Sequence, residues 1–361
     1  MDREHVLNLL ENLRKSLKDL QNNPIFTSNG SYSDIKSLLE LHTKADSVFS
    51  KNPGLSKLSQ LLCSIKTLLE KLEKFQDFGL KSLLSRQITG YKISQLAYSI
   101  EAEIQACIDR DSVENLVKTL LSEKEDEKVE VLIEFIKRLS KGFDSEFQDL
   151  ILKAKVFSIL ETLLCDENCS KRVREHVALA ISGLASFNRN VFVGLVLMGP
   201  TIQTLTSMDS SISIQVLCSL ISLVRSPLID EIHSRGEIPK ILSLLSSENL
   251  SIRVAATDCI CEIAYFGRRE VIEAMLEQGL IPKLMELQRS KHKDQDGDNM
   301  ENQPFANCVA RFAVQVEVGE GLSSKEKEQV KLEILNRVRG YSVSEAESAS
   351  IVAEVLWGSS P

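Results

Sequence analysis

The sequence predicts an all-α protein, in which an N-terminal four-helix bundle is followed by a right-handed helical solenoid. The first observation is composition, because the 361 residues include only 16 glycines and 8 prolines, so residues that favour turns are rare. The second is periodicity, because apolar residues recur at the three- and four-residue steps of a helix. The third is repetition, because related segments recur about every 40 residues, a period typical of helical solenoids.

Residues 1–110 are predicted to form the bundle. Its four amphipathic helices are expected over residues 2–21, 34–49, 55–78 and 80–108, with breaks at Asn22-Asn23-Pro24, at Asn52-Pro53-Gly54 and at Gly79. Each carries one apolar stripe, and short connections between such helices favour antiparallel packing around a shared core.

Residues 111–361 are predicted to form the solenoid. Three helical segments end in related residues, Ala185, Val224 and Ala264, which are 39 and 40 positions apart. Between the last two, and again after the third, glycine and proline recur in Gly236-Glu-Ile-Pro239 and Gly279-Leu-Ile-Pro282. Glycine permits a tight corner, and proline is tolerated in the first turn of a helix. Since a unit of this size cannot bury its own apolar face, neighbouring units must stack.

The solenoid is expected to contain one interruption and a terminal cap. Residues 289–304 are polar and include a glycine and a proline, which predicts an exposed insertion. A helix resumes over 305–318. Two further helices, over 325–339 and 344–357, are expected to cap the open end.

The repeated pattern resembles the armadillo repeat. Its parts are the Gly-x-Ile-Pro-Lys segment and, after a loop, Ile252-Arg253-x-x-Ala256 with Ile260, Ile263 and Ala264 following in the same helix. The resemblance covers residues 150–290 best. A helical bundle followed by armadillo repeats is similar to the plant U-box/armadillo family with its U-box-type N-terminal domain, although no U-box lies between bundle and repeats here.

This resemblance implies a protein-binding adaptor or scaffold, acting in signalling or ubiquitin pathways through the bundle and the armadillo groove. The bundle is also similar to the four-helix domain of necroptotic pseudokinases, which can act at membranes. A membrane-associated regulatory helical-bundle protein is therefore the alternative function. An enzyme is the third possibility, and no motif favours it.

In armadillo proteins the third helix of each repeat lines a concave groove, and nuclear-import receptors carry Trp and Asn there. The matching positions in this chain, together with Glu175 in the first of these helices, are Leu179, Gly183, Cys218, Ser222, Asp258 and Glu262. Because none of them is Trp or Asn, an importin-like function is disfavoured. The two acidic residues would make one end of the groove suited to a basic or polar peptide, unless they are simply solvated surface charges.

Three candidate chemical sites fail on spacing. The run from Asp294 to Asp298 resembles a calcium loop, but its sixth and twelfth positions are not the required Gly and Glu. The histidine His42 lacks the spacing of a phosphotransfer site. The set Cys165, Cys169 and His176 offers three zinc ligands where a structural site needs four.

No HExxH, GxSxG or P-loop motif is present, so the sequence predicts no catalysis, metal or cofactor. The net charge of −8 argues against nucleic acid as a partner. The eight cysteines lie mostly in apolar helical stretches, which indicates packed thiols in a reducing compartment. No signal peptide and no apolar run of about 20 residues is found, so we expect a location in the cytoplasm or also the nucleus, and membrane contact has no support in the sequence.

Overall fold

The computed structural model describes residues 8, 10–15, 55–74, 80–290 and 304–357, and within these ranges every regular element is a helix. The predicted all-α class is confirmed for this part of the chain. The chain divides into two compact units. Unit 1 comprises the described residues up to Val117 together with Asp144–Ala154, and unit 2 comprises Lys118–Phe143 and the described residues from Lys155 onward.

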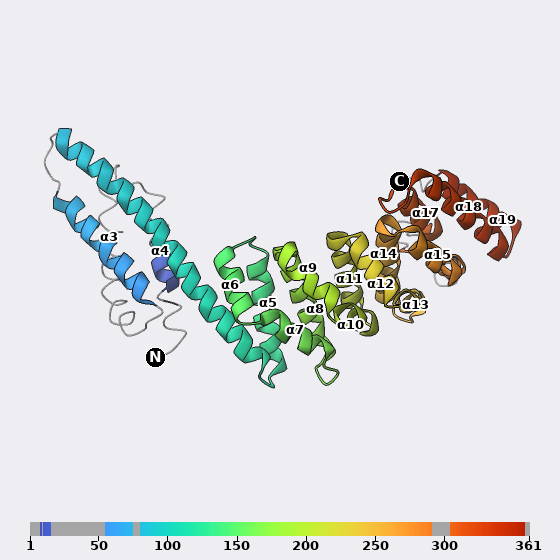
Figure 1. Cartoon of the computed structure of the whole chain (residues 1–361), viewed down its shortest axis with the longest axis horizontal. Coiled ribbons are helices and arrows are strands. Elements are labelled where there is room, and N and C mark those ends of the chain that lie inside the picture. The colour runs from blue at the N-terminus through green and yellow to red at the C-terminus, as the bar shows by residue number, and fades with distance from the viewer. Residues whose placement is uncertain (1–7, 9, 16–54, 75–79, 291–303, 358–361) are drawn as a thin grey trace, which may run out of the picture. The chain divides into compact units, whose positions relative to one another are not determined.

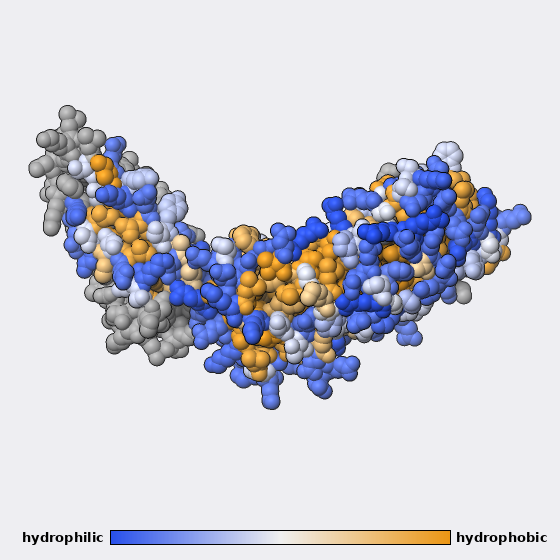
Figure 2. All heavy atoms as spheres, in the orientation of Figure 1, coloured by the Kyte–Doolittle hydropathy of each residue, from blue (hydrophilic) through white to orange (hydrophobic). Residues whose placement is uncertain are grey.

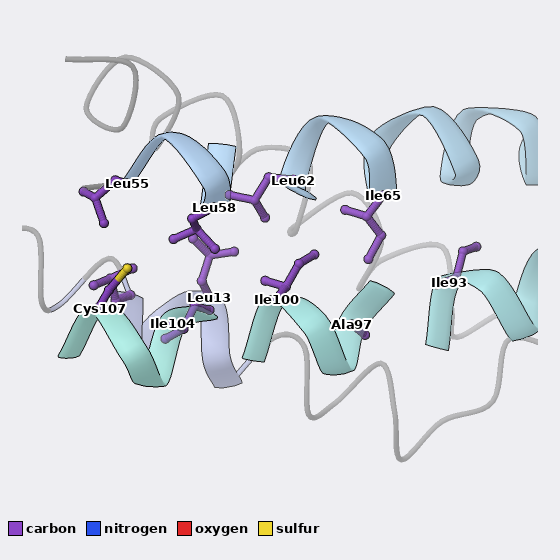
Figure 3. Packing of buried hydrophobic residues seen from close by; sticks show 11 residues of the cluster. Leu13, Leu55, Leu58, Leu62, Ile65, Ile93, Ala97, Ile100, Ile104 and Cys107 are labelled. Atoms are coloured by element: carbon purple, nitrogen blue, oxygen red, sulfur yellow. The ribbon is translucent and has the colours of Figure 1, made fainter. Parts of the chain in front are cut away.

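Unit 1 contains α3 (Ser56–Lys74), most of α4 (Leu80–Leu120) and α6 (Ser145–Lys153). Its core is a cluster of aliphatic side chains that α3 and α4 direct toward each other, joined by Leu10 and Leu13 (Figure 3). On α4 the core residues Ile93, Ala97, Ile100 and Ile104 follow the three- and four-residue helical steps. Of the four predicted bundle helices, the one over 34–49 lies outside the described residues, and only residues 8 and 10–15 of the first are described, as helix.

Helix α4 continues to Leu120, beyond the predicted end near residue 108. Polar residues follow that point, yet they support the helix instead of ending it. The amide of Gln105 donates to Asp109 Oδ1 at 2.9 Å, and Arg110 Nη2 lies 3.0 Å from Glu103 Oε1. The first pair joins successive turns, an arrangement that stabilises a helix, and the second spans two turns of the same helix. The buried Glu103 carboxylate also binds Lys57 of α3 at 2.6 Å, and this hydrogen bond raises the pKa of Lys57.

Unit 2 repeats a pattern of short outer helices followed by a longer one. The helices in chain order are α5 (Glu125–Leu139), α7 (Val156–Cys165), α8 (Lys171–Phe187), α9 (Arg189–Met198), α10 (Thr201–Ser207), α11 (Ser211–Val224), α12 (Ser226–Ser234), α13 (Ile238–Ser243) with the 3-10 turn η2 (Leu244–Ser246), α14 (Leu250–Phe266), α15 (Arg269–Glu277), α16 (Leu280–Ser290) and α17 (Cys308–Val318).

The helices α5, α8, α11, α14 and α17 pack side by side in that order, and we call this row the ladder (Figure 1). Contacts between neighbouring repeats join residues about one repeat apart. Thr201 Oγ1 donates to Glu161 Oε1 across 40 positions, and Lys283 Nζ donates to the carbonyl of Leu242 across 41. The predicted period of about 40 residues is therefore the period of the structure.

Local sequence signals fix where the ladder helices begin. The side chains of Ser170, Ser210 and Asn249 accept hydrogen bonds from backbone N–H groups in the first turns of α8, α11 and α14. The corners before α13 and α16 use Gly236 and Gly279 at φ of 71° and 80°, the left-handed region that suits glycine.

The end of the described chain is formed by α18 (Ser324–Tyr341) and α19 (Glu345–Trp357). They agree with the predicted pair of terminal helices to within two residues at each end. Both pack on α17. The start of α18 is fixed by a capping box, in which Glu326 accepts from the backbone N–H of Ser323 at 2.8 Å.

Candidate protein-binding face

Each ladder helix has an exposed side, and we call these sides together the ladder face. Helix α8 shows how it arises, because its buried residues Val173, Val177, Ile181 and Leu184 alternate at helical steps with more exposed ones. The more exposed set is Arg172, Glu175, Leu179, Gly183 and Ser186. These positions recur every three or four residues along one side of α8, where Gly183 lies against Leu139 of α5.

All seven sequence-predicted groove residues lie on α8, α11 and α14, three consecutive ladder helices. Leu179 and Ser222 are exposed, and the other five are half-buried. The structure joins two of these residues directly, because Ser222 Oγ donates to Glu262 Oε2 at 2.8 Å. Glu175 instead accepts from the buried hydroxyl of Ser210 at 2.5 Å, at the start of α11.

Asp258 has a partner that sequence reasoning missed. Arg311 Nη2 of α17 lies 2.9 Å from Asp258 Oδ1, and both side chains are partly exposed. The two residues are 53 positions apart, because residues 289–304 lie between the last two ladder helices and break the step of about 40. Continuing the repeat register past the insertion would have found Arg311. The charged end of the ladder face therefore combines Asp258 and Glu262 with one cation.

Cys218 lies next to these acidic groups. Burial raises the pKa of its thiol to about 12, and the nearby carboxylates of Glu262 and Asp258 act in the same direction. Burial likewise raises the pKa of Cys259 well above its ordinary value. These thiols are protonated at neutral pH, so they serve as packing groups and not as nucleophiles.

At the other end of the ladder, α5 and α8 each expose an aliphatic side chain among charged ones. Arg172 of α8 forms an ion pair with Asp126 of α5 at 2.8 Å, and the backbone N–H of Ser170 donates to Glu125 Oε1 at 3.1 Å. Ile133 is 50% exposed and Leu179 is 37% exposed. Sequence reasoning missed Ile133 because α5 lacks the repeat pattern and follows a charged stretch, although the exposed aliphatic residue inside an amphipathic helix was a usable signal.

Arg225, a residue with a strained backbone conformation, lies at the carboxyl end of one ladder helix and contacts residues at the carboxyl ends of two others. Arg225, just after α11, has φ 69° and ψ −143°, a region that residues with a side chain rarely adopt. Its guanidinium lies 5.5 Å from the ring centre of Phe266 at the end of α14. It also bonds Glu320 Oε2, just after α17, at 3.1 Å. Arg225 therefore bridges successive repeats at one edge of the ladder.

A second apolar surface lies off the ladder on α9, where Leu195 is 39% exposed and Met198 is 82% exposed. Figure 2 shows hydrophobic residues gathered over the part of unit 2 that holds α8 and α9. The part that holds α15 and α18 is mostly hydrophilic in the same view.

The sites rejected on sequence grounds receive no support from the described residues. Cys165 Sγ contacts the hydroxyl of Thr204 at 3.3 Å, and His176 Nδ1 contacts its own helix at the carbonyl of Arg172 at 2.8 Å. Within the described ranges no group of three or more His, Cys, Asp or Glu residues could hold a metal ion. His42 and the run from Asp294 to Asp298 lie outside the described residues. In the described part of the chain, no helix combines the length and apolar character needed to cross a membrane.

Comparison with known proteins agrees with the repeat architecture. A HEAT-repeat family model matches residues 238–266. These residues span α13, η2 and α14 completely. Together with the ladder and its period, the match makes this a helical-repeat protein. No curated protein matches the chain.

Among solved structures, one designed armadillo repeat protein is 18% identical, with 68% of this chain and 99% of that chain covered and a TM-score of 0.45. Another, solved in complex with peptide (KR)4, is 19% identical, with 68% and 98% covered and a TM-score of 0.44. A further engineered protein is 16% identical, with 99% of this chain and 88% of that chain covered and a TM-score of 0.47.

Proposed function

We propose that this protein is a non-enzymatic adaptor whose ladder face binds a segment of a partner protein. The observation that carries the proposal is the composition of that face. Exposed aliphatic residues lie on the first two ladder helices, Ile133 on α5 and Leu179 on α8, and the acidic Asp258 and Glu262 lie further along the ladder on α14. A surface with apolar contact area and polar groups that fix orientation is suited to macromolecular recognition.

The pathway is proposed from the resemblance to the plant U-box/armadillo family. A chain with the bundle and the repeats, and without a U-box between them, would connect partners in signalling or ubiquitin pathways in the cytoplasm or the nucleus. In this proposal the ladder face holds one partner, and unit 1 is available for another.

The test is capture of partners by the full chain and by a double variant of the ladder face, Leu179→Glu with Glu262→Lys. The matched control is Leu195→Glu with Glu277→Lys. Leu195 is as exposed as Leu179 but lies on α9, and Glu277 is an exposed acid of α15, so neither is on the ladder. Both double variants have the same net charge, one unit more positive than that of the wild type.

We expect the ladder variant to lose the captured proteins, identified by quantitative mass spectrometry, and the control to retain them. Thermal melting checks that both variants remain folded, because Glu262 is half-buried and its replacement removes the hydrogen bond from Ser222. If the ladder variant retains the captured proteins and the control variant loses them, the binding surface lies on the outer helices and the proposal is wrong.

A further inference from the structure

We infer that the outer surface of α9 binds the same surface of a second copy of this chain, with the two α9 helices crossing antiparallel about a twofold axis at Gly194. The surface consists of Val191, Gly194, Leu195 and Met198, which recur every three or four residues along one side of the helix, and we call it the α9 face. It lies off the ladder, so the inference goes beyond the proposed function and does not depend on it.

The α9 face is apolar where the corresponding helices of later repeats expose charges. Helices α12 and α15 follow their ladder helices as α9 follows α8, and their partly or fully exposed residues include Asp230, Glu231, Glu270, Glu273 and Glu277. Residues 190–208, in contrast, contain no ionisable side chain, although 26% of the chain is Asp, Glu, Lys or Arg. The repeat therefore does not require an apolar surface here, and an exposed apolar patch of this kind marks an interaction site.

Gly194 allows a second helix to approach α9 closely. It is exposed in the middle of α9, and a Cβ atom placed on it would have no described atom within 4 Å. Glycine inside a helix is less stable than alanine, and no contact within the described chain requires it at this position. A helix that crosses at Gly194 can cover Leu195 and Met198 together, which removes apolar surface from water.

The charges at the two ends of α9 favour a second copy as the partner. Arg189 is exposed at the amino end. At the carboxyl end the Glu161 carboxylate lies beside Gly199, and Glu231 forms an ion pair with Arg235 at 2.6 Å. One end therefore has an excess positive charge and the other an excess negative charge. Two copies that cross antiparallel place these unlike ends opposite each other, and they also oppose the two helix dipoles.

A twofold interface imposes a further condition that the α9 face meets. Each residue near the axis faces its own counterpart in the other copy, so a charged residue there would face a like charge. With a net charge of −8 the two copies repel each other in general, and an uncharged face lets them meet without such a pair. One helix from each copy buries less than the about 800 Å² per partner of a standard interface, so we expect a weak dimer with a micromolar dissociation constant.

The experiment measures the mass of the full chain by sedimentation equilibrium across micromolar concentrations, for the wild type and for Gly194→Lys and Gly194→Glu. Both replacements favour a helix more than glycine does, so circular dichroism and thermal melting should show that the variants stay folded. Each variant alone places two like charges at the axis, which should weaken dimerisation about 100-fold. An equimolar mixture of the two places lysine opposite glutamate and should dimerise again.

The matched controls are Leu332→Lys and Leu332→Glu, at a residue of α18 that is 61% exposed. They should dimerise like the wild type, alone and mixed, and so should the ladder variant Leu179→Glu, even where it loses its partner protein. A wild type that is monomeric throughout, a dimer that persists in both Gly194 variants, or a mixture that stays monomeric would contradict the inference. Loss of the dimer in the Leu332 variants would equally contradict it. None of these results bears on the ladder face, so the proposed function stands or fails separately.

Discussion

The two units bury their apolar residues in different ways. In unit 1 the described core lies between two long helices, where Leu58 and Ile65 of α3 meet Ile93 and Ile100 of α4. In unit 2 each ladder helix packs mainly against the one before and the one after it, so the core is a series of similar local contacts. Helices of both units leave one side exposed, as Tyr98 of α4 shows at 66% exposed, but in the described chain the ladder repeats its exposed positions from one helix to the next.

This difference explains why we place binding on unit 2. Contacts about 40 residues apart repeat along the ladder, so functional positions of one repeat have counterparts in the next. A residue change on the exposed side of one rung alters the surface without disturbing the packing behind it. Residues that pack the α3–α4 core lack that freedom.

The largest effect is expected from Leu58→Ala, which removes a fully buried side chain from the core of unit 1. Such a truncation costs about 2–5 kcal/mol. Hydrogen exchange should show loss of protection in α3 and α4 and unchanged protection in α11 and α14. Equal loss in the ladder helices would mean that the two units unfold as one block.

A smaller effect is expected from Ala256→Leu, which forces three extra carbon atoms into a fully buried site on α14. Overpacking of this kind costs about 1–3 kcal/mol. Urea denaturation should show the loss in the free energy of unfolding, and hydrogen exchange should show reduced protection in α11, α14 and α17. The control is Ala353→Leu on α19, an exposed position where the same change should be nearly neutral. A neutral result at Ala256 would contradict the repeat register.

The bridge at the edge of the ladder predicts an unusual order of stabilities. Arg225→Ala and Arg225→Gly both lose the contacts to Glu320 and Phe266, but only glycine adopts φ 69° without strain. We therefore expect the glycine variant to be more stable than the alanine variant by about 1 kcal/mol in denaturation experiments. At an ordinary exposed position the glycine variant is the less stable one. An alanine variant more stable than the glycine variant would therefore show that position 225 is unstrained.

The smallest effect concerns pH. The Cys218 thiol has a pKa of about 12 in the folded chain against an ordinary value of 9.0, so above pH 9 the unfolded chain loses this proton first. The contribution of the neutral thiol is complete below pH 9 and is lost as pH rises toward 12. Cys218→Ala should therefore give a shallower fall in the urea midpoint above pH 9 than the wild type. Parallel curves for the two proteins would contradict burial of this thiol.

The fold was predictable wherever local signals act within one repeat. Gly236 and Gly279 mark corners that the backbone requires, and the terminal helices end close to their predicted bounds. Helix α4 was predicted too short because Asp109 and Arg110 resemble a break until their partners, Gln105 and Glu103, are known.

The sequence placed the candidate residues on successive helices, whereas their pairing could not be predicted, and their part in binding stays a prediction. Repeat register placed Leu179, Cys218 and Asp258 on successive ladder helices, because a regular period fixes which residues share a level. The ion pair of Asp258 with Arg311 could not be read in the same way, since the insertion shifts the register. Ile133 lies in a helix without the repeat pattern, so the repeat register does not extend to it.

The most direct test compares the two units as binding surfaces by photo-crosslinking. Benzoylphenylalanine replaces Leu179 on the ladder face in one variant and Tyr98, a 66% exposed residue of α4, in the other. Each is irradiated with a purified, labelled partner protein that the full chain captures. The ladder account predicts a crosslink from position 179 that excess unlabelled partner abolishes, and none from position 98. A competed crosslink from position 98 with none from 179 would contradict it and assign binding to unit 1.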